Sequence, residues 1–555
     1  MVVKRERMER ALEAVRAKLA DAVAPGEPGA VVLVSSRGEP AGWVASGVES
    51  LESRKSITTH TIFDVGSVAK AVTGLAVAIL EEEGTLSSAA DLRDVLPELP
   101  PYVDGVRVEH LLHHESGLRN YFGLLYYRAG WHPRLSPSSD EAFAAVCRVG
   151  RLAFPPGTRY AYCDTNYLLL ARIVERLAGR RFGEFARSRI FAPLGMNESY
   201  ISDAASSAPT DERARAEGYV PYAIDLESPF ALRAPGAPRT DLQPVRLRYD
   251  HVGAEGFYAS AADLALLAKH ILFPALVSPE TLRGRLLAAP RVRDDGLGYG
   301  YGLNVGTYRG RRFIGHDGAI WGYSASVAVF PDDDLEVVCL TNRDDVGAWN
   351  LRSAVLDALD ISDPRSRRPS PPPPAVAGAR IPPDLKGAYL DATSLDFLEI
   401  VERDGGLAAS LSGGPAVGLV PGENGALCAE NGSLTIRVCG DRSSLRVETG
   451  EVERTFERFA RLSGRDAFRP YEGTYVCDEL ATTFDVAATE TGVRLRNRDR
   501  RRPSMDLDYT PTLRDLFWSR DPYVELIQLR FLRERGAVRA FVYGDTEDLL
   551  FVRKA

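Results

Sequence analysis

Residues 61–84 read TIFDVGSVAKAVTGLAVAILEEEG, a short apolar strand pattern that turns at Gly66 and continues as an apolar helix from about Ser67. Gly84 follows three glutamates and predicts the end of this helix. Because the helix is apolar nearly all round, we expect it to be buried. Ser67 and Lys70 are three residues apart, so the pattern predicts two side chains on one helical face, with Cβ atoms about 5–6 Å apart.

This Ser-x-x-Lys pair predicts a nucleophile beside a proton acceptor. Burial disfavours the charged form of an amine and lowers its pKa, which would let Lys70 act as a general base toward Ser67. The free N–H groups at the start of the helix would point at the group that Ser67 attacks. The alternative is a serine that caps the helix and a lysine that is exposed, because short patterns of common residues arise by chance. A lysine inside an apolar helix favours the catalytic interpretation.

The composition is that of an ordinary globular protein. The 555 residues are 45% apolar and 26% charged, with a formal net charge of −8. The length predicts two to four domains, and the negative charge argues against nucleic acid or an anionic membrane as the main partner. Six scattered cysteines without a C-x-x-C pair favour a reducing compartment and argue against a zinc site. Since we find neither a signal-peptide pattern nor an apolar run of membrane-spanning length, we expect a cytoplasmic protein.

The first 360 residues predict an α+β domain. An amphipathic helix at 7–23 precedes paired strands within 28–50, and a helix-rich middle separates these from a second group of strands, expected at 299–305, 311–314, 323–330 and 335–340. Strands at both ends of the domain imply an antiparallel sheet in which the first and last strands are neighbours and helices flank the sheet.

The remaining third of the chain has a different character. Residues 361–382 are rich in proline and predict a stiff, extended linker. Beyond it, short alternating segments are typical of small antiparallel β-barrels. Gly387-Ala-Tyr389 matches Gly473-Thr-Tyr475, and further matches follow at the same offset. We therefore expect two successive barrels, lipocalin-like, at 383–463 and 468–555.

Two further stretches could complete a site around Ser67. In FPPGTRYAYCDTNY (154–167), the phenol of Tyr162 could pass protons between Ser67 and a leaving group, and Asp164 is placed to cap a helix. In FIGHDGAIWG (313–322), His316 lies between glycines at a strand end, where the N–H of Ala319 could join that of Ser67 as an oxyanion hole. The alternatives are a buried packing tyrosine and a surface histidine in a turn.

Two clusters of rings remain open to more than one interpretation. His110, His113 and His114 lack partners at metal-ligand spacing, so we interpret them as structural histidines, with no metal and no cofactor expected. Residues 120–139 are aromatic and predict an irregular segment, in which Tyr121 either fills the core or lines a substrate pocket. We include Tyr121 among the candidate substrate-binding residues.

The three pieces together resemble the serine β-lactamase and penicillin-binding-protein superfamily, with its early Ser-x-x-Lys and later motifs. The version here is similar to the class C β-lactamase and D-aminopeptidase branch, as are EHLLHHESGL (109–118) and FPPGTRYAY (154–162). The resemblance covers about residues 8–360, and the two barrels are similar to the layout of D-aminopeptidases. It implies a β-lactamase/transpeptidase-like domain over 1–360 in which the candidate residues have the following roles: Ser67 as nucleophile, Lys70 as base or base partner, Tyr162 as proton shuttle, the N–H groups of Ser67 and Ala319 as oxyanion hole, and Asp164, His316 and Gly318 as substrate-binding residues.

The chain departs from the family pattern at two of these positions. Asp164 replaces the commoner asparagine, so it can only accept hydrogen bonds and would attract Lys70. His316 replaces a lysine, and a mostly neutral imidazole suits a substrate carboxylate less well than a fixed cation does. Both changes argue against β-lactam turnover.

We therefore expect a serine hydrolase that forms an acyl-enzyme on amide or ester bonds, first of all a D-stereospecific aminopeptidase, peptidase or esterase. Two alternatives stay open. One is an acyltransferase or cyclase of peptide natural-product assembly, in which an amine replaces water. The other is a penicillin-binding-like sensor that does not turn over. The expected partners are a small-molecule or short-peptide substrate and, in a homodimer, a second copy of the chain, with neither nucleic acid nor membrane.

Overall fold

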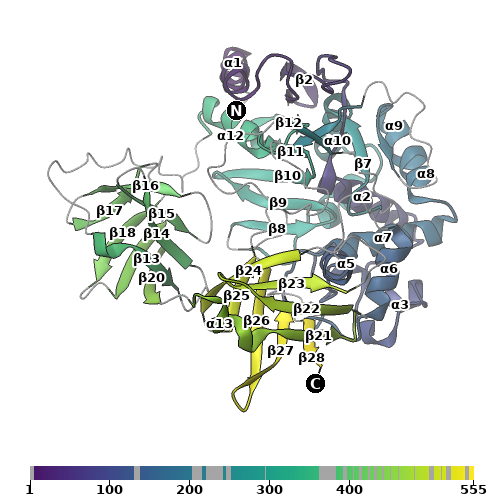
Figure 1. Cartoon of the computed structure of the whole chain (residues 1–555). Helices are drawn as coiled ribbons and strands as arrows, with labels where there is room; N and C mark the ends of the chain where they lie inside the picture. The colour runs from purple at the N-terminus through teal and green to yellow at the C-terminus, as the bar shows by residue number, and fades with distance from the viewer. Residues whose placement is uncertain are drawn as a thin grey trace. The chain divides into compact units, whose positions relative to one another are not determined.

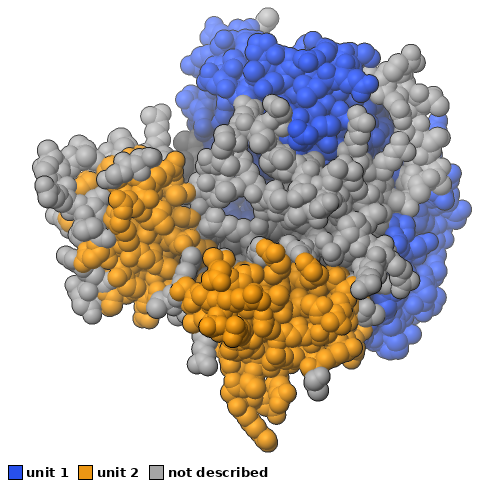
Figure 2. Space-filling model, viewed as in Figure 1, with its two compact units in different colours: residues 1–223, 240–362 blue, residues 224–239, 363–555 orange. Residues whose placement is uncertain are grey.

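The computed structural model describes residues 5–129, 138–202, 215–220, 242–245, 252–293, 295–361 and 383–554, the last range with short gaps. The chain divides into two compact units, shown in Figure 2. Unit 1 comprises residues 1–223 and 240–362, and unit 2 comprises residues 224–239 and 363–555. Most of the predicted linker, residues 362–382, lies outside the described part of the chain. None of the helices described is long and apolar enough to cross a membrane.

Unit 1 contains a seven-stranded antiparallel sheet in the order β2-β1-β12-β11-β10-β9-β8 (Figure 1). Its strands are β1 (Ala30–Ser36), β2 (Glu39–Ser46), β8 (Leu297–Gly300), β9 (Leu303–Tyr308), β10 (Arg311–Ile320), β11 (Tyr323–Phe330) and β12 (Leu335–Thr341). β1 pairs with β12 along its whole length, from Ala30 opposite Thr341 to Ser36 opposite Leu335. The prediction that the first and last strands are neighbours is confirmed.

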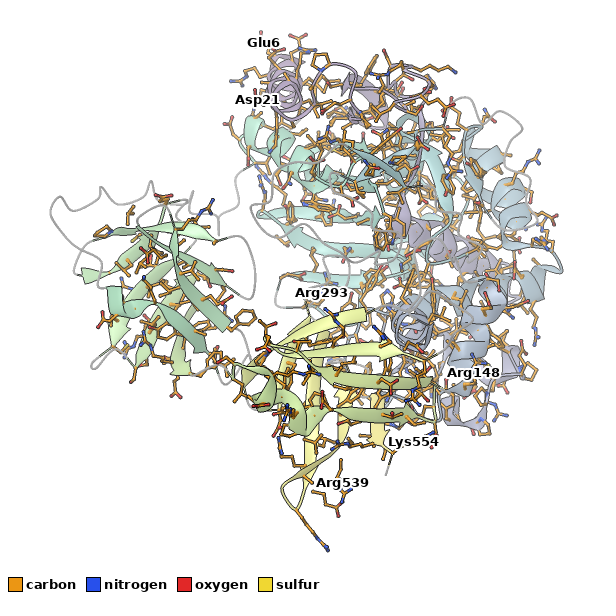
Figure 3. The ribbon with its side chains drawn as sticks, in the orientation of Figure 1. Glu6, Asp21, Arg148, Arg293, Arg539 and Lys554 are labelled. Atoms are coloured by element: carbon orange, nitrogen blue, oxygen red, sulfur yellow. The ribbon has the colours of Figure 1, made fainter. Side chains whose placement is uncertain are left out.

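Helices cover both faces of this sheet. Side chains alternate along β1, so Val32 and Val34 face one core cluster while Val31 and Leu33 face the other. The first cluster is covered by α1 (Arg5–Ala22) and α12 (Ala348–Ala358), and the second by α2 (Ala69–Glu82), α7 (Asp164–Ala178) and α10 (Ala261–Leu272). Figure 3 shows Glu6 and Asp21 projecting from α1, whose outer face is exposed. The predicted α+β architecture is confirmed.

The central helix α2 is buried along almost its entire length, as its composition predicts: every residue from Ala69 to Glu81 is buried. A single 3₁₀ turn, Gly66–Val68, precedes it, so Ser67 lies in that turn rather than in the first turn of the α-helix. Asp64 holds the turn, because its Oδ1 accepts the N–H of Gly66 at 3.0 Å.

The remaining elements of unit 1 are short: α3 (Leu92–Val95), α4 (Val108–Leu112), α5 (Tyr121–Ala129), α6 (Ser139–Arg148), α8 (Phe182–Ala186), α9 (Ala192–Leu194), α11 (Pro279–Thr281), β3 (Ile62–Asp64), β4 (Tyr200–Ile201), β5 (Gly218–Val220), β6 (Gln243–Val245) and β7 (Phe257–Ser260). The prediction that residues 120–139 are irregular is wrong for α5. Tyr121, Leu124 and Leu125 are all buried at helical spacing, so core packing determines the structure of this aromatic stretch.

Unit 2 contains two closed eight-stranded antiparallel barrels. The first consists of β13 (Gly387–Leu390), β14 (Phe397–Arg403), β15 (Gly406–Leu411), β16 (Val417–Pro421), β17 (Leu427–Ala429), β18 (Thr435–Cys439), β19 (Ser444–Thr449) and β20 (Val452–Phe459). After the short helix α13 (Arg465–Phe468), the second consists of β21 (Gly473–Cys477), β22 (Thr482–Ala488), β23 (Val493–Asn497), β24 (Asp506–Leu513), β25 (Leu516–Ser519), β26 (Ile527–Glu534), β27 (Ala537–Tyr543) and β28 (Leu549–Arg553).

The sequence repeat is reproduced in the register of the two barrels. Gly387 pairs with Ile400 in the first barrel, and Gly473 pairs with Val486 in the second, as the matched positions require. Tyr389 donates its hydroxyl hydrogen to the carbonyl of residue 385, and Tyr475 does the same to residue 471. The prediction of two successive antiparallel barrels is confirmed.

Candidate active site

Lys70 makes three polar contacts from a fully buried position, in addition to its contact with Tyr162. Its Nζ lies 2.9 Å from Ser67 Oγ, 3.1 Å from the carbonyl oxygen of Ala254 and 2.7 Å from Asp164 Oδ1. An ammonium group has three N–H donors, so each donor has an acceptor here. Ser67 is partly exposed although the residues on both sides of it are buried.

The charge state of Lys70 differs from the sequence-based expectation. Burial alone lowers the pKa of Lys70, as predicted, but the charge and hydrogen bond of Asp164, together with Tyr162 and Glu255, more than offset this and hold the pKa above its usual value. The expectation of an uncharged amine is therefore wrong for the resting site. Lys70 is the cation of a buried ion pair with Asp164.

Asp164 is the first residue of α7, and its side chain does not cap that helix. One carboxylate oxygen contacts Lys70, and the other accepts a hydrogen bond from Asn120 Nδ2 at 3.0 Å. The capping prediction is wrong because both oxygens face the site instead. Asn120 was not among the candidate residues, and no motif in the sequence marks it.

Tyr162 lies over Lys70, with the ring centroid 4.9 Å from Nζ, and is 40% exposed. Burial around the hydroxyl raises the pKa of Tyr162 to about 12, although Lys70 and a hydrogen bond to Ser67 act in the opposite direction. Tyr162 is therefore a neutral phenol at physiological pH that contacts both Ser67 and Lys70. The structure brings Ser67, Lys70, Tyr162 and Asp164 together.

Two glycines allow β10 to pass directly against the turn that holds Ser67. A Cβ atom on Gly318 would lie 2.0 Å from the carbonyl oxygen of Val65 and 3.1 Å from the amide nitrogen of Ser67. A Cβ atom on Gly66 would lie 3.0 Å from the amide nitrogen of Ala319. The backbone of β10 at Gly318 and Ala319 therefore lies directly against the backbone of Gly66 and Ser67, and the oxyanion hole formed by residues 67 and 319 stays a prediction.

Among the described strands, the second half of β10 has a partner on one side only. β10 pairs with β11 through Ile320, but its pairing with β9 ends where Gly315 lies opposite Asn304. An extended substrate could add to residues 316–320 by strand pairing. His316 and Gly318 both lie in this segment, in the second half of β10 rather than at its end.

His316 is 5% exposed, and both of its ring nitrogens have partners. Nδ1 lies 2.5 Å from the carbonyl oxygen of Asp317, and Nε2 lies 2.9 Å from the hydroxyl of Tyr299. Burial and the charge of Lys70 lower the pKa of His316 to about 4, against the opposing effect of Asp317. Tyr299 was not among the candidate residues. His316 is thus a neutral imidazole at physiological pH.

Two neighbouring histidines, His113 and His114, contact residues of the site. His114 is fully buried, and its Nδ1 accepts hydrogen bonds from the N–H of Cys163 (3.1 Å) and from Asn166 Nδ2 (3.0 Å). Its ring lies 4.4 Å from that of Tyr162. His113 Nδ1 contacts the carbonyl oxygen of Tyr299 at 2.8 Å. Over the described ranges, no group of acidic, histidine and cysteine side chains could hold a metal ion.

The sequence left two interpretations of Tyr121 open, core packing and a pocket wall, and its contacts favour core packing. Its side chain is fully buried and stacks on Phe122 at 4.6 Å, and its N–H donates to Thr165 Oγ1 at 2.8 Å. It thus packs behind the segment that carries Tyr162 and Asp164.

Comparison with known proteins gives matches over most of the chain. A family model described as Beta-lactamase matches residues 10–361. A D-aminopeptidase of Cereibacter sphaeroides (strain ATCC 17023) is 26% identical over 461 residues, which cover 81% of this chain and 81% of that protein. Two solved structures share the fold. The octameric penicillin-binding protein homologue from Pyrococcus abyssi has a TM-score of 0.56 and 22% identity over 81% of this chain and 99% of that one. D-amino acid amidase from Ochrobactrum anthropi SV3 has a TM-score of 0.53 and 20% identity over 63% of this chain and 99% of that one.

Proposed function

The chain belongs to the Beta-lactamase family and is a serine hydrolase, and we propose that it cleaves amide or ester bonds of small substrates whose acyl residue has the D configuration. The observation that carries this proposal is the contact of Lys70 Nζ with Ser67 Oγ at 2.9 Å beneath the phenol of Tyr162. The similarity to a D-aminopeptidase supports the choice of substrate. It covers 81% of this chain, so it extends beyond the family-model match, which ends at residue 361, into unit 2.

In the proposed acylation, Ser67 Oγ attacks the substrate carbonyl and loses its proton toward Lys70. Because Lys70 is already protonated, it first passes a proton across 2.7 Å to Asp164, and the neutral amine then takes the proton of Ser67. The N–H groups of Ser67 and Ala319 stabilise the negative charge on the carbonyl oxygen. The Lys70–Asp164 pair gains one proton in this step.

The leaving group departs with the proton of the Tyr162 hydroxyl, and Lys70 returns a proton to Tyr162 through the hydrogen bond between them. The net result is that the serine proton ends on the leaving amine or alkoxide, and the Lys70–Asp164 pair regains its resting charge. Water then repeats the sequence in reverse and releases the acid. Each group named here contacts its neighbour in the resting site, so no large rearrangement is needed.

A covalent probe tests the nucleophile directly. Intact mass after incubation with a fluorophosphonate should show one adduct, located on Ser67 by peptide mapping and absent from Ser67→Ala. A parallel screen of D- and L-aminoacyl amides and esters should show turnover of the D-series. If the folded protein takes up no adduct, the proposal is wrong. If it forms the adduct and turns over only L-substrates, the nucleophile stands and the stereochemistry is wrong.

A further inference from the structure

Tyr299 is fixed at both its backbone and its hydroxyl. It lies in β8, is 2% exposed, and its carbonyl oxygen accepts a hydrogen bond from His113 Nδ1 at 2.8 Å. Its ring lies edge-on to the ring of Tyr162, with centroids 6.0 Å apart, and its hydroxyl is 2.9 Å from Nε2 of His316. The hydroxyl of this buried tyrosine therefore lies between two partners, Nε2 of His316 and the hydroxyl of Tyr167.

The contacts determine which nitrogen of His316 carries the proton. A carbonyl oxygen can only accept, so the nitrogen next to the carbonyl of Asp317 is Nδ1–H. A neutral imidazole then has a bare Nε2, which accepts the O–H of Tyr299. Both nitrogens are used inside the protein. A substrate that lies along β10 therefore meets no N–H group and no cation from His316.

We infer that Tyr299 is a positioning residue that sets the charge selectivity of the site, because its hydroxyl occupies the one nitrogen of His316 that could otherwise bind a carboxylate. This inference rests on the proposed function and narrows its substrate class. The site selects substrates whose leaving group is uncharged next to the scissile bond, such as amides, alkyl esters and peptide amides, and disfavours those that carry a carboxylate there.

The leaving group lies beside His316 for a geometric reason. Tyr162, which would protonate the leaving group, has its ring centroid 6.3 Å from that of His316. Among the described residues, the charged groups that act on His316 are already paired within the protein: Lys70 of α2 with Asp164 of α7, and Asp317 of β10 with Arg352 of α12. His114, also near, is neutral because burial holds its pKa well below the usual value.

The first test observes His316 in the wild-type chain and needs no catalysis. A long-range ¹H–¹⁵N correlation spectrum, with the signal assigned by its loss in His316→Gln, should show Nδ1 protonated and Nε2 bare, with no titration above about pH 5, as the pKa near 4 requires. In Tyr299→Phe the donor to the neutral form is removed, so the pKa of His316 should rise by about one unit. A wild-type His316 that is protonated on Nε2, or that titrates near pH 6.5, overturns the inference.

The second test uses two substrates that differ only in one charge, D-alanylglycinamide and D-alanylglycine. The wild type should prefer the amide, and Tyr299→Phe should narrow the ratio of the two kcat/KM values by about tenfold at pH 5.5 and much less at pH 8, since one pKa unit is a factor of ten in protonation. His316→Lys should narrow the ratio at both pH values. Tyr301→Phe is the matched control, because it removes another buried tyrosine hydroxyl, one that donates to Glu81, and should leave the ratio unchanged.

The outcomes separate the two proposals. If the wild type cleaves neither substrate but His316 has the expected tautomer and shifts in Tyr299→Phe, the positioning role holds and the proposed substrate is wrong. If both substrates are cleaved and the ratio is the same in the wild type and a folded Tyr299→Phe, the positioning role is wrong and the hydrolase stands. Should Tyr299→Phe not fold, the tautomer of His316 in the wild type still decides whether its Nε2 is bare, as the contact with Tyr299 requires. His316→Lys still decides whether a cation at residue 316 narrows the ratio of the two kcat/KM values.

Discussion

Asp164 Oδ1 lies 2.7 Å from Lys70 Nζ, and the lysine side chain has no exposed surface. A carboxylate at this position, where the family pattern has an amide, turns the lysine beside Ser67 into one half of an ion pair. Charges taken out of water in this way are stable only as a pair, and removing one partner of a buried pair costs about 3–5 kcal/mol. Lys70 and Asp164 therefore have to be considered together. In the resting site they carry one proton more than a neutral lysine beside a carboxylate would carry.

The role of Asp164 can be read from the pH dependence of Asp164→Asn. In the wild type the carboxylate can take the proton that Lys70 must release, so activity should persist well below the pKa of the lysine. In the variant Lys70 has to be neutral from the start. We expect kcat/KM to fall by about 10²-fold at pH 6 and to recover as the pH rises through the pKa of Lys70, which is lower once the carboxylate charge is gone. The measurement is the pH profile of acylation by a fluorophosphonate.

The opposite shift would contradict the relay. If Asp164 only holds Lys70 in its charged form, Asp164→Asn would lower the pKa of the lysine with no loss of an acceptor. The acidic limb of the profile would then move to lower pH than in the wild type, and activity at pH 6 would rise. Asn120→Ala is a useful comparison, because it removes the other contact of the carboxylate and leaves its charge.

A second prediction concerns stability and the turn before Ser67. Burial raises the pKa of Asp64 from 3.8 to about 6, while the N–H of Gly66 and Arg215 act in the opposite direction. A carboxyl group with a raised pKa stabilises the fold fully below pH 3.8 and progressively loses that contribution as the pH rises through 6. The loss amounts to at most about 3 kcal/mol at 1.36 kcal/mol per pKa unit. Asp64→Asn keeps an acceptor for Gly66 and should remove this pH dependence.

The measurement for Asp64 is the midpoint of urea unfolding of unit 1 at pH 4.5 and at pH 7.5, with tryptophan fluorescence as the signal. The wild type should lose more stability than Asp64→Asn between the two pH values. A wild type that gains stability relative to the variant over this range would show that Arg215 keeps Asp64 charged in the folded state.

The third prediction separates two contacts of His114, its hydrogen bond with the N–H of Cys163 and its ring contact with Tyr162. This residue has a φ of +56°, a conformation that asparagine tolerates and most side chains do not. His114→Asn keeps both this backbone and an acceptor for the N–H of Cys163, whereas His114→Phe keeps a ring beside Tyr162 and leaves that N–H buried without a partner. The unpaired group should make the phenylalanine variant less stable than the asparagine variant by about 1–3 kcal/mol. Equal melting temperatures for the two variants would show that the hydrogen bond between His114 and the N–H of Cys163 does not stabilise the segment around Cys163.

Most of the architecture follows from local pattern in the sequence. The paired strands within residues 28–50, the apolar run of α2 and the offset between Gly387 and Gly473 each depend on neighbouring residues, and each was predicted correctly. The aromatic stretch of α5 was not, because its helical spacing becomes clear only when the buried face is known.

The electrostatics of the site could not be obtained in the same way. Lys70 and Asp164 are distant in the sequence, and burial of the lysine alone predicts the opposite shift of its pKa. The contact between Tyr299 and His316 likewise depends on how β8 and β10 are brought together through β9, and no motif marks it. The residue types of the site were therefore predictable, while their protonation states required the three-dimensional contacts.

The last prediction tests whether β10 forms half of the oxyanion hole. In Gly318→Ala the new Cβ atom would lie 2.0 Å from the carbonyl oxygen of Val65, so β10 must move away from the turn and carry the N–H of Ala319 with it. Loss of one oxyanion donor costs about 10²–10³-fold in kcat, and KM should change little because the substrate still pairs with the strand edge. Gly150→Ala is the matched control, since a Cβ atom there meets nothing within 4 Å, and it should retain full activity. If Gly318→Ala is folded and as active as Gly150→Ala, the oxyanion must be stabilised by groups other than the N–H of residue 319.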